Sequence, residues 1–143
     1  MTVHDVRIEV TPLQTEGMRD VRGDVVRRQL IADHGVDVGI VRSICGYLIR
    51  SQYDASSIAP RVQDIFSDPI IEFGAVDTPV IHDSNFFPQT PSLCVTIGFK
   101  PGVTDNPGAA ANDGFQVLFP DINAAISTYT TYVFTDLPET VDN

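Results

Sequence analysis

The chain has 143 residues, of which 43% are hydrophobic, and a net charge of −10 at pH 7 with histidine neutral. This charge argues against a nucleic-acid partner, because nucleic-acid binding needs a basic track that displaces counterions. The length fits one ordinary domain or two small ones that pack on each other, and the hydrophobic content argues against disorder.

Neither a signal peptide nor a membrane span is expected. The first residues, Met1 to Asp5, lack a positive n-region and an apolar h-region, and no apolar run reaches the roughly eighteen residues of a membrane helix. With two cysteines, Cys45 and Cys94, the chain has no disulfide framework. We therefore expect a reducing, cytoplasmic location.

A strand and a helix open the chain. Residues 6–11 alternate apolar and polar side chains, as in a strand with one buried face. Asp20 is a good N-cap and Gly35 a good stop signal. The apolar residues between them recur on one helical face, which we expect to be buried: Val21, Val25, Val26, Leu30 and Ile31. The basic residues Arg19, Arg22, Arg27 and Arg28 alternate with Asp20 and Asp24, which predicts a solvated face.

Two or three further strands and a second helix are expected before residue 75. Residues 36–50 predict either two strands or one long strand bent at a glycine. A helix is expected from Asp54 to Phe66, starting near Ser56 or Ser57, with Pro60 tolerated only in the first turn. Its inward residues are Ile58, Val62, Ile65 and Phe66. Residues 70–73 predict a final strand.

Residues 75–92 contain three prolines and no clear periodicity, which predicts a linker. We expect its apolar residues to pack on the surface of the fold: Val80, Ile81, Phe86 and Phe87. A second strand–helix pair follows, with a strand over 93–99 and a helix that has Asn106 as N-cap and Pro107 in its first position. That helix ends near Phe119, before Pro120.

The chain repeats itself at an offset of 85 residues, which predicts a duplication. This offset pairs Asp20 with Asp105 and Gly23 with Gly108. It also pairs residues of like character further on: Val41 with Ile126, Tyr47 with Tyr132, Leu48 with Val133, and Ile49 with Phe134. Upstream, Val6, Ile8 and Val10 match Val95, Ile97 and Phe99 at an offset of 89, which predicts a four-residue insertion before Asp20.

We therefore expect an α+β fold of two ferredoxin-like βαββαβ units, whose sheets face each other or join edge to edge. The first unit spans 1–76, the linker 77–92, and the second unit 93–143. At the same offset Asn143 matches Ile58, so the second unit lacks a counterpart of residues 59–74. We expect a fragment or an incomplete reading frame, with an exposed core and an unpaired strand edge that favour self-association.

The sequence assigns no catalytic, cofactor-binding or metal-binding residue. Cys45 and Cys94 lie in apolar strands, where a cysteine is usually a small hydrophobe. The histidines His4, His34 and His82 lack metal-ligand spacing. The carboxylates near the C-terminus are expected to be solvated: Asp136, Glu139 and Asp142. Residues 101–108 could form a phosphate-binding loop before a helix, but they lack a P-loop lysine, and Asp105 would repel an anion. Turn formation and helix capping explain the segment better.

One family resembles this pattern. Residues 93–108, Leu-Cys-Val-Thr-Ile-Gly-Phe-Lys-Pro-Gly-Val-Thr-Asp-Asn-Pro-Gly, resemble a signature of the PurS-like region of phosphoribosylformylglycinamidine synthase. Residues 6–10, 20–23 and 67–72 of the first copy resemble it too. The resemblance covers nearly the whole chain, is least specific in the linker, and matches the form in which two PurS-like units are fused at the N-terminus of a large enzyme.

The resemblance implies a non-catalytic part of a purine-biosynthetic ligase. That enzyme transfers glutamine-derived ammonia to formylglycinamide ribonucleotide, using ATP and Mg²⁺. Its PurS-like part carries neither the ATP site nor the glutaminase cysteine; it bridges the synthetase and glutaminase parts, the partners expected here in cis or in trans. The alternative is a free-standing α+β ligand-binding or regulatory module with a pocket between its two units.

Overall fold

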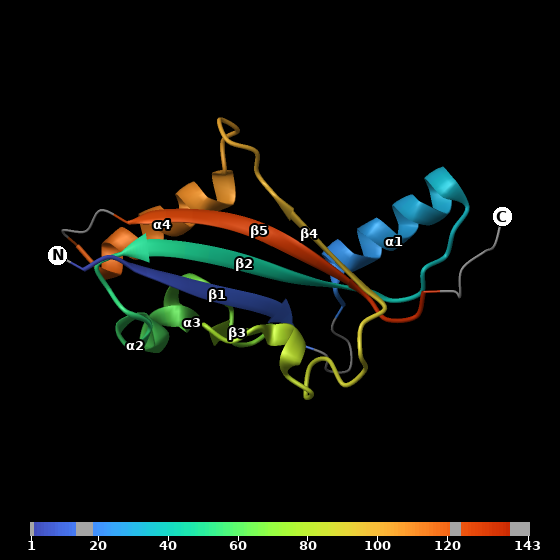
Figure 1. Cartoon of the computed structure of the whole chain (residues 1–143), viewed down its shortest axis with the longest axis horizontal. Helices are drawn as coiled ribbons and strands as arrows, with labels where there is room; N and C mark the ends of the chain where they lie inside the picture. The colour runs from blue at the N-terminus through green and yellow to red at the C-terminus, as the bar shows by residue number, and fades with distance from the viewer. Residues whose placement is uncertain (1, 14–18, 121–123, 138–143) are drawn as a thin grey trace.

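The computed structural model describes residues 2–13, 19–120 and 124–137, and these form an α+β fold with one antiparallel sheet (Figure 1). The strands are β1 (His4–Pro12), β2 (Val41–Ser51), β3 (Glu72–Val76), β4 (Leu93–Gly98) and β5 (Ala125–Phe134). The α-helices are α1 (Val21–His34), α2 (Ala55–Ile58), α3 (Val62–Ile65) and α4 (Asn106–Leu118), and the 3-10 turns are η1 (Ala59–Arg61) and η2 (Val80–His82). Within the described ranges, no helix is long and apolar enough to cross a membrane.

The sheet has the order β3-β1-β2-β5-β4, so the two halves of the chain join edge to edge through β2 and β5. Cys45 lies opposite Thr130 in this antiparallel pair, and these residues are 85 positions apart. Val41 pairs with Phe134, and their counterparts at the same offset, Ile126 and Ile49, also pair. A half-turn about the Cys45–Thr130 pair therefore exchanges the two strands. It also exchanges α1 with α4, which lie toward opposite ends of the sheet (Figure 1).

The register of the outer strands corrects the upstream offset. Val6 pairs with Ile49 in the first half, and Leu93 pairs with Phe134 in the second. Because Ile49 and Phe134 correspond, Val6 corresponds to Leu93 at an offset of 87, and not to Val95 at 89. The loop of the first half is therefore two residues longer than that of the second, and the predicted four-residue insertion is wrong.

The middle of the first half also differs from the prediction. Residues 36–40 form no strand, so this half has the order βαβαβ in place of βαββαβ. The expected second helix is divided into α2, η1 and α3, because Pro60 lacks an N–H and falls in the interior of the segment. Its N-cap is Asp54, whose side chain accepts a hydrogen bond from Ser57 N at 3.0 Å.

The last strand of the first half begins two residues later than predicted. β3 starts at Glu72, and Ile70 and Ile71 lie before it with 76% and 44% of their surface exposed. Asp68 and Pro69 place these residues in a turn, in which Ile71 N and Glu72 N donate to Asp68 O. The turn therefore uses residues that the sequence pattern assigned to the strand.

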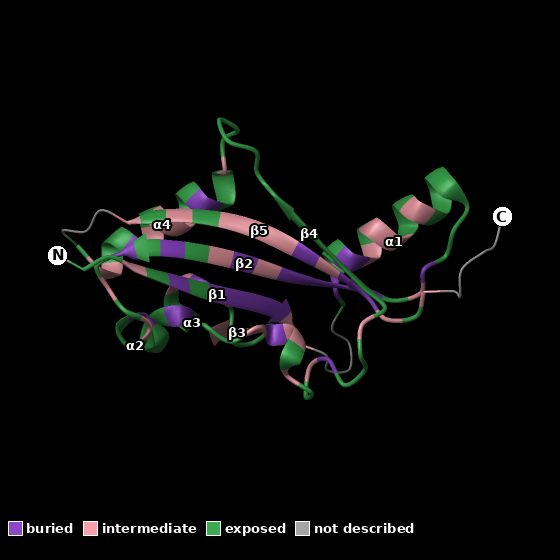
Figure 2. Cartoon of the chain, viewed as in Figure 1, coloured by how far each residue is buried: buried purple, intermediate pink, exposed green. Residues whose placement is uncertain are grey.

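The main core lies between the sheet and the α2–α3 and α4 helices. Its buried residues are Val6, Ile8, Val10, Ile49, Ile58, Val62, Phe66 and Phe115. Linker residues pack on the opposite face of the sheet, where Val80 and Phe87 are buried against Ile44 and Val133, as predicted for the linker. Burial is greatest along β1 and β2 and falls toward β4, which is exposed throughout (Figure 2).

Helix α1 does not bury the face that its sequence predicts. Val21, Val25 and Ile31 are 66%, 46% and 43% exposed, and Gly23 is the fully buried residue of the helix. Val26 and Leu30 pack partly against a small cluster of Val38, Val41 and Phe134. The helix ends as predicted, with Gly35 in the left-handed conformation at φ 65°.

The aromatic cluster of α4 gives a test of the core. Phe115 is fully buried and stacks on Phe119 with ring centroids 4.7 Å apart, whereas Val117 in the same helix is 79% exposed. We expect Phe115→Ala to lower the free energy of unfolding by about 3–5 kcal/mol, because it leaves a cavity. The control Val117→Ala should change it by less than about 0.5 kcal/mol. Urea denaturation measures both, and similar losses for the two variants would contradict this packing.

Candidate functional site

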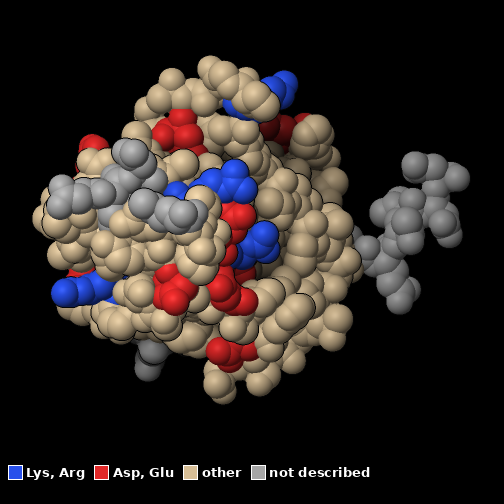
Figure 3. Space-filling model, turned by 60° about the vertical axis from the view of Figure 1, so that its left-hand side comes forward, with Lys and Arg blue, Asp and Glu red and all other residues tan. Residues whose placement is uncertain are grey.

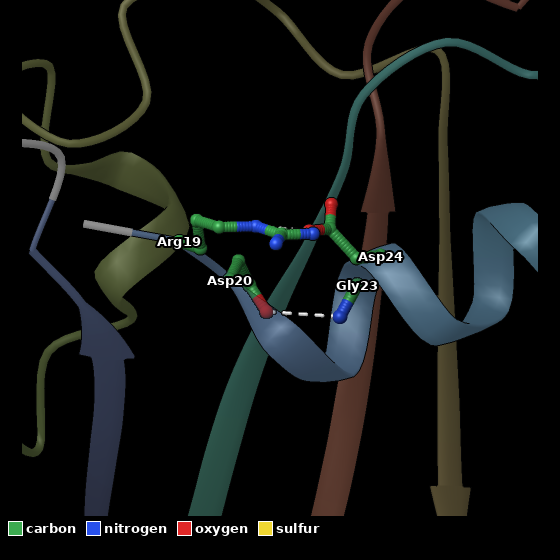
Figure 4. A network of polar contacts seen from close by, with 4 residues as sticks. All are labelled: Arg19, Asp20, Gly23 and Asp24. Carbon is green, nitrogen blue, oxygen red and sulfur yellow. Dashed lines mark hydrogen bonds and ion pairs between the residues drawn. The ribbon is translucent and has the colours of Figure 1, made fainter. Parts of the chain in front are cut away.

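The start of α1 is fixed by one buried carboxylate, Asp20, which joins the helix to strand β2. Asp20 Oδ1 accepts hydrogen bonds from Gly23 N at 2.9 Å and from Ser43 Oγ at 2.8 Å. Asp20 Oδ2 accepts from Ser43 N at 2.6 Å. The bond to Gly23 caps the helix, as the sequence predicts (Figure 4). The two bonds to Ser43 hold the same carboxylate on the strand.

The start of α4 has the same construction. Asp105 Oδ1 accepts from Gly108 N at 2.7 Å and from Thr128 Oγ1 at 2.8 Å, and Asp105 Oδ2 accepts from Thr128 N at 2.6 Å. Each donor lies 85 residues after its counterpart at the first junction. The N-cap is therefore Asp105, and the prediction of Asn106 was wrong by one residue.

Both junctions depend on a glycine that lets the helix approach the sheet. A Cβ atom on Gly23 would lie 1.8 Å from Val41 O, and one on Gly108 would lie 2.7 Å from Ile126 O. Both obstacles are backbone carbonyls of the following strand, and they too are 85 residues apart. The aspartate and the glycine thus act together. The aspartate bonds the helix to the strand, and the glycine allows the helix backbone to lie close to the strand backbone.

Ion pairs surround the first junction on its solvent side. Arg19 Nη2 lies 2.6 Å from Asp24 Oδ2 (Figure 4), and Arg27 Nε lies 2.9 Å from Asp37 Oδ1. The hydrogen bond from Arg27 lowers the pKa of Asp37. Basic and acidic side chains also lie next to each other on the face drawn in Figure 3. These arginines are paired with carboxylates, in agreement with the predicted solvated face.

A second buried carboxylate, Glu9, links three segments on the opposite face of the sheet. Glu9 Oε1 accepts from Val80 N at 2.9 Å, and Glu9 Oε2 accepts from Tyr129 OH at 2.6 Å. The ring of Tyr129 lies over Gly46, where a Cβ atom would come within 1.9 Å of it. Burial, followed by the bond to Glu9, raises the pKa of Tyr129, so the phenol stays protonated and donates at neutral pH.

Arg42 is the most buried cation of this face, with 8% of its surface exposed. Its guanidinium lies 3.9 Å from the centre of the Phe87 ring, and Nη1 donates to Phe86 O. Nε and Nη2 are buried and have no hydrogen-bond partner among the described residues. Burial lowers the pKa of Arg42. A pocket of about 290 Å³ adjoins this side chain, and Asp136, expected to be solvated, also lines it.

The two cysteines occupy different environments. Cys45 is half-buried and accepts a hydrogen bond from Arg22 Nη1 at 2.9 Å, and burial raises the pKa of its thiol. Cys94 is exposed on β4, in contrast to the buried position expected from its sequence context. Partial burial also raises the pKa of the Cys94 thiol, so neither thiol is activated.

The remaining candidates are scattered. His4 begins β1, His34 ends α1 and His82 ends η2. No group of three or more metal-ligating side chains occurs in the described part of the chain. Glu139 and Asp142 lie outside the described residues. In the loop 101–108, Gly102 has a φ of 85° and Asp105 caps the helix, so a carboxylate already occupies the place that a bound phosphate would take.

Two members of the junctions, Ser43 and Thr128, were not predicted. Each lies 23 residues after its aspartate, so no local capping rule identifies it. A signal was present in the repeat, because the offset of 85 aligns a hydroxyl side chain with a hydroxyl side chain at this position.

Comparisons with family models, with curated proteins and with solved structures give no match to this chain.

The junction glycines give a second test. Alanine normally stabilises a helix by about 1 kcal/mol relative to glycine. At Gly23 and Gly108 the added methyl group meets a backbone carbonyl, so we expect a loss of about 1–3 kcal/mol in unfolding free energy, larger for Gly23→Ala. The control is Gly114→Ala in α4, whose Cβ would lie 3.6 Å from Ile65 Cγ2, and it should stabilise the protein. Stabilisation by Gly23→Ala in thermal unfolding would contradict the close approach.

Proposed function

We propose that the two halves are copies of one PurS-like unit of ferredoxin-like type, joined through β2 and β5. The repeated junction is the observation that carries this proposal. A carboxylate, a glycine and a hydroxyl residue recur at one offset with the same three hydrogen bonds. The second copy has counterparts of β1, α1 and β2 in β4, α4 and β5, and the described residues contain no counterpart of the α2–β3 segment.

In this proposal the chain is a scaffold segment of phosphoribosylformylglycinamidine synthase, the ATP- and glutamine-dependent ligase of purine biosynthesis. It catalyses no step itself and holds the synthetase and glutaminase parts together. ATP and Mg²⁺ belong to the synthetase part. The support from the fold is mechanical: a continuous sheet with a helix anchored toward each end offers two similar surfaces on one rigid body, which suits a bridge between two other domains.

Reconstitution tests the proposal. The chain is added to synthetase and glutaminase subunits of a PurS-dependent synthase from which PurS has been left out. We expect glutamine-dependent formation of formylglycinamidine ribonucleotide to rise at least about tenfold, because the bridge restores ammonia transfer between the subunits. The product is measured by chromatography.

Ammonium chloride in place of glutamine is the control for this experiment. Free ammonia reaches the synthetase without a bridge, so the chain should have little effect on the ammonia-dependent rate. A chain that leaves the glutamine-dependent rate unchanged, or raises both rates equally, would contradict the bridging role.

The alternative, a ligand-binding module, has one observation in its favour. Arg42 lines a pocket together with Asn85 and Gln89, and two of its buried guanidinium nitrogens have no hydrogen-bond partner among the described residues. This arrangement suits a small anion, although Asp136 in the same lining opposes one. Calorimetry with nucleotides and amino acids distinguishes the two functions. Saturable micromolar binding to the wild-type chain, lost in Arg42→Met, would favour the module, and the scaffold proposal predicts no such binding.

A further inference from the structure

Strand β4 is an edge strand whose apolar face is uncovered. Leu93, Val95 and Ile97 point to the same face of the sheet as the main core, yet they are 47%, 37% and 56% exposed. Phe99, just beyond the strand, is 48% exposed. Exposed apolar residues this close together on one strand are a feature of binding surfaces.

The first half shows what such a strand normally contacts. The counterparts of these residues on β1 are Val6, Ile8 and Val10, and they are at most 2% exposed. There β3 pairs with the outer edge of β1, and α2 and α3 cover its apolar face. No described strand pairs with the outer edge of β4. The same strand position is thus covered in one half and open in the other.

The register of the sheet shows which residues of β4 direct their backbone hydrogen-bonding groups toward the open edge. Asp77 N, at the end of β3, donates to Arg7 O, so the odd-numbered residues of β1 direct their backbone groups toward β3. By the offset of 87 residues, the matching residues of β4 are Cys94, Thr96 and Gly98. Their N–H and C=O groups therefore point away from β5 and are available to another strand.

The sequence of β4 is complementary to itself when two copies run antiparallel. A twofold axis at Thr96 places Val95 opposite Ile97 and Leu93 opposite Phe99, so apolar residues meet on one face. Residues 93–99 carry no charged side chain, and Lys100 would face Ser92. Although the chain has a net charge of −10, this contact therefore contains no pair of like charges. The chain already uses such a pairing within itself, where β2 meets β5 about Cys45 and Thr130.

We propose that β4 is an interface with a second copy of this chain, paired antiparallel about Thr96 to form a continuous ten-stranded sheet. The pairing satisfies the outward backbone groups of both strands and brings the two uncovered apolar faces side by side. The inference rests on the geometry of β4 and does not require the proposed function.

Sedimentation equilibrium of the full chain from about 1 to 500 µM tests the interface, and a concentration-dependent dimer is expected. Ile97→Lys should weaken the dimer at least about tenfold, since the twofold axis introduces the lysine twice. The matched control is Val117→Lys, which removes an even more exposed apolar side chain and adds the same charge on α4. It should leave the dissociation constant unchanged. Circular dichroism verifies that both variants are folded.

The position of the twofold axis is tested by cross-linking. In a Cys45→Ser, Cys94→Ser background, Thr96→Cys places identical residues directly opposite each other, at a distance that allows a disulfide. It should give a cross-linked dimer under mild oxidation, whereas Val95→Cys should not, because its partner is Ile97. Three results would overturn the proposal: a monomer at all concentrations, equal weakening by Ile97→Lys and Val117→Lys, or equal cross-linking at 95 and 96. A monomer would leave the edge to a partner of different sequence.

Discussion

The antiparallel pairing of β2 with β5 makes one sheet out of two halves, and the other features depend on it. Its register runs from Val41–Phe134 to Arg50–Ala125, the longest ladder in the sheet. Cys45 and Thr130 lie at the centre of this ladder. Corresponding elements of the two halves therefore lie at opposite ends of the sheet. The two anchored helix starts follow from this relation, and so does the contrast between the covered strand β1 and the open strand β4.

Local rules were enough to predict where α1 starts and stops. Asp20 and Gly35 could be predicted because a cap involves neighbouring residues, and the repeat located the second junction at Asp105 and Gly108. The assignment of Asn106 as the cap failed because both residues can cap a helix; only the contact with Thr128, far along the chain, selects Asp105. The α+β class followed from the alternation of the two periodicities, one of strands and one of helices.

Other features could not be predicted, because they depend on which elements meet. The strand offset was wrong by two residues, and a shift of two keeps every side chain on its face, so the hydrophobic pattern cannot detect it. In α1 the pattern gives a buried stripe, but no described element covers Val21 or Val25. The contact of Glu9 with Tyr129 spans 120 residues and left no trace in either local sequence.

The Glu9 cluster has a consequence for the linker. One carboxylate holds a strand of the first half, the phenol of the second half and the backbone of the linker. Loss of any of the three leaves a buried acceptor or donor without its partner, which is costly in a region of low dielectric. The linker is therefore a packed part of the fold and not a flexible connection. The length of residues 77–92 is constrained by the core that they cover. We would expect evolution to tolerate insertions in the exposed loop at Gly102 far more readily than in this segment.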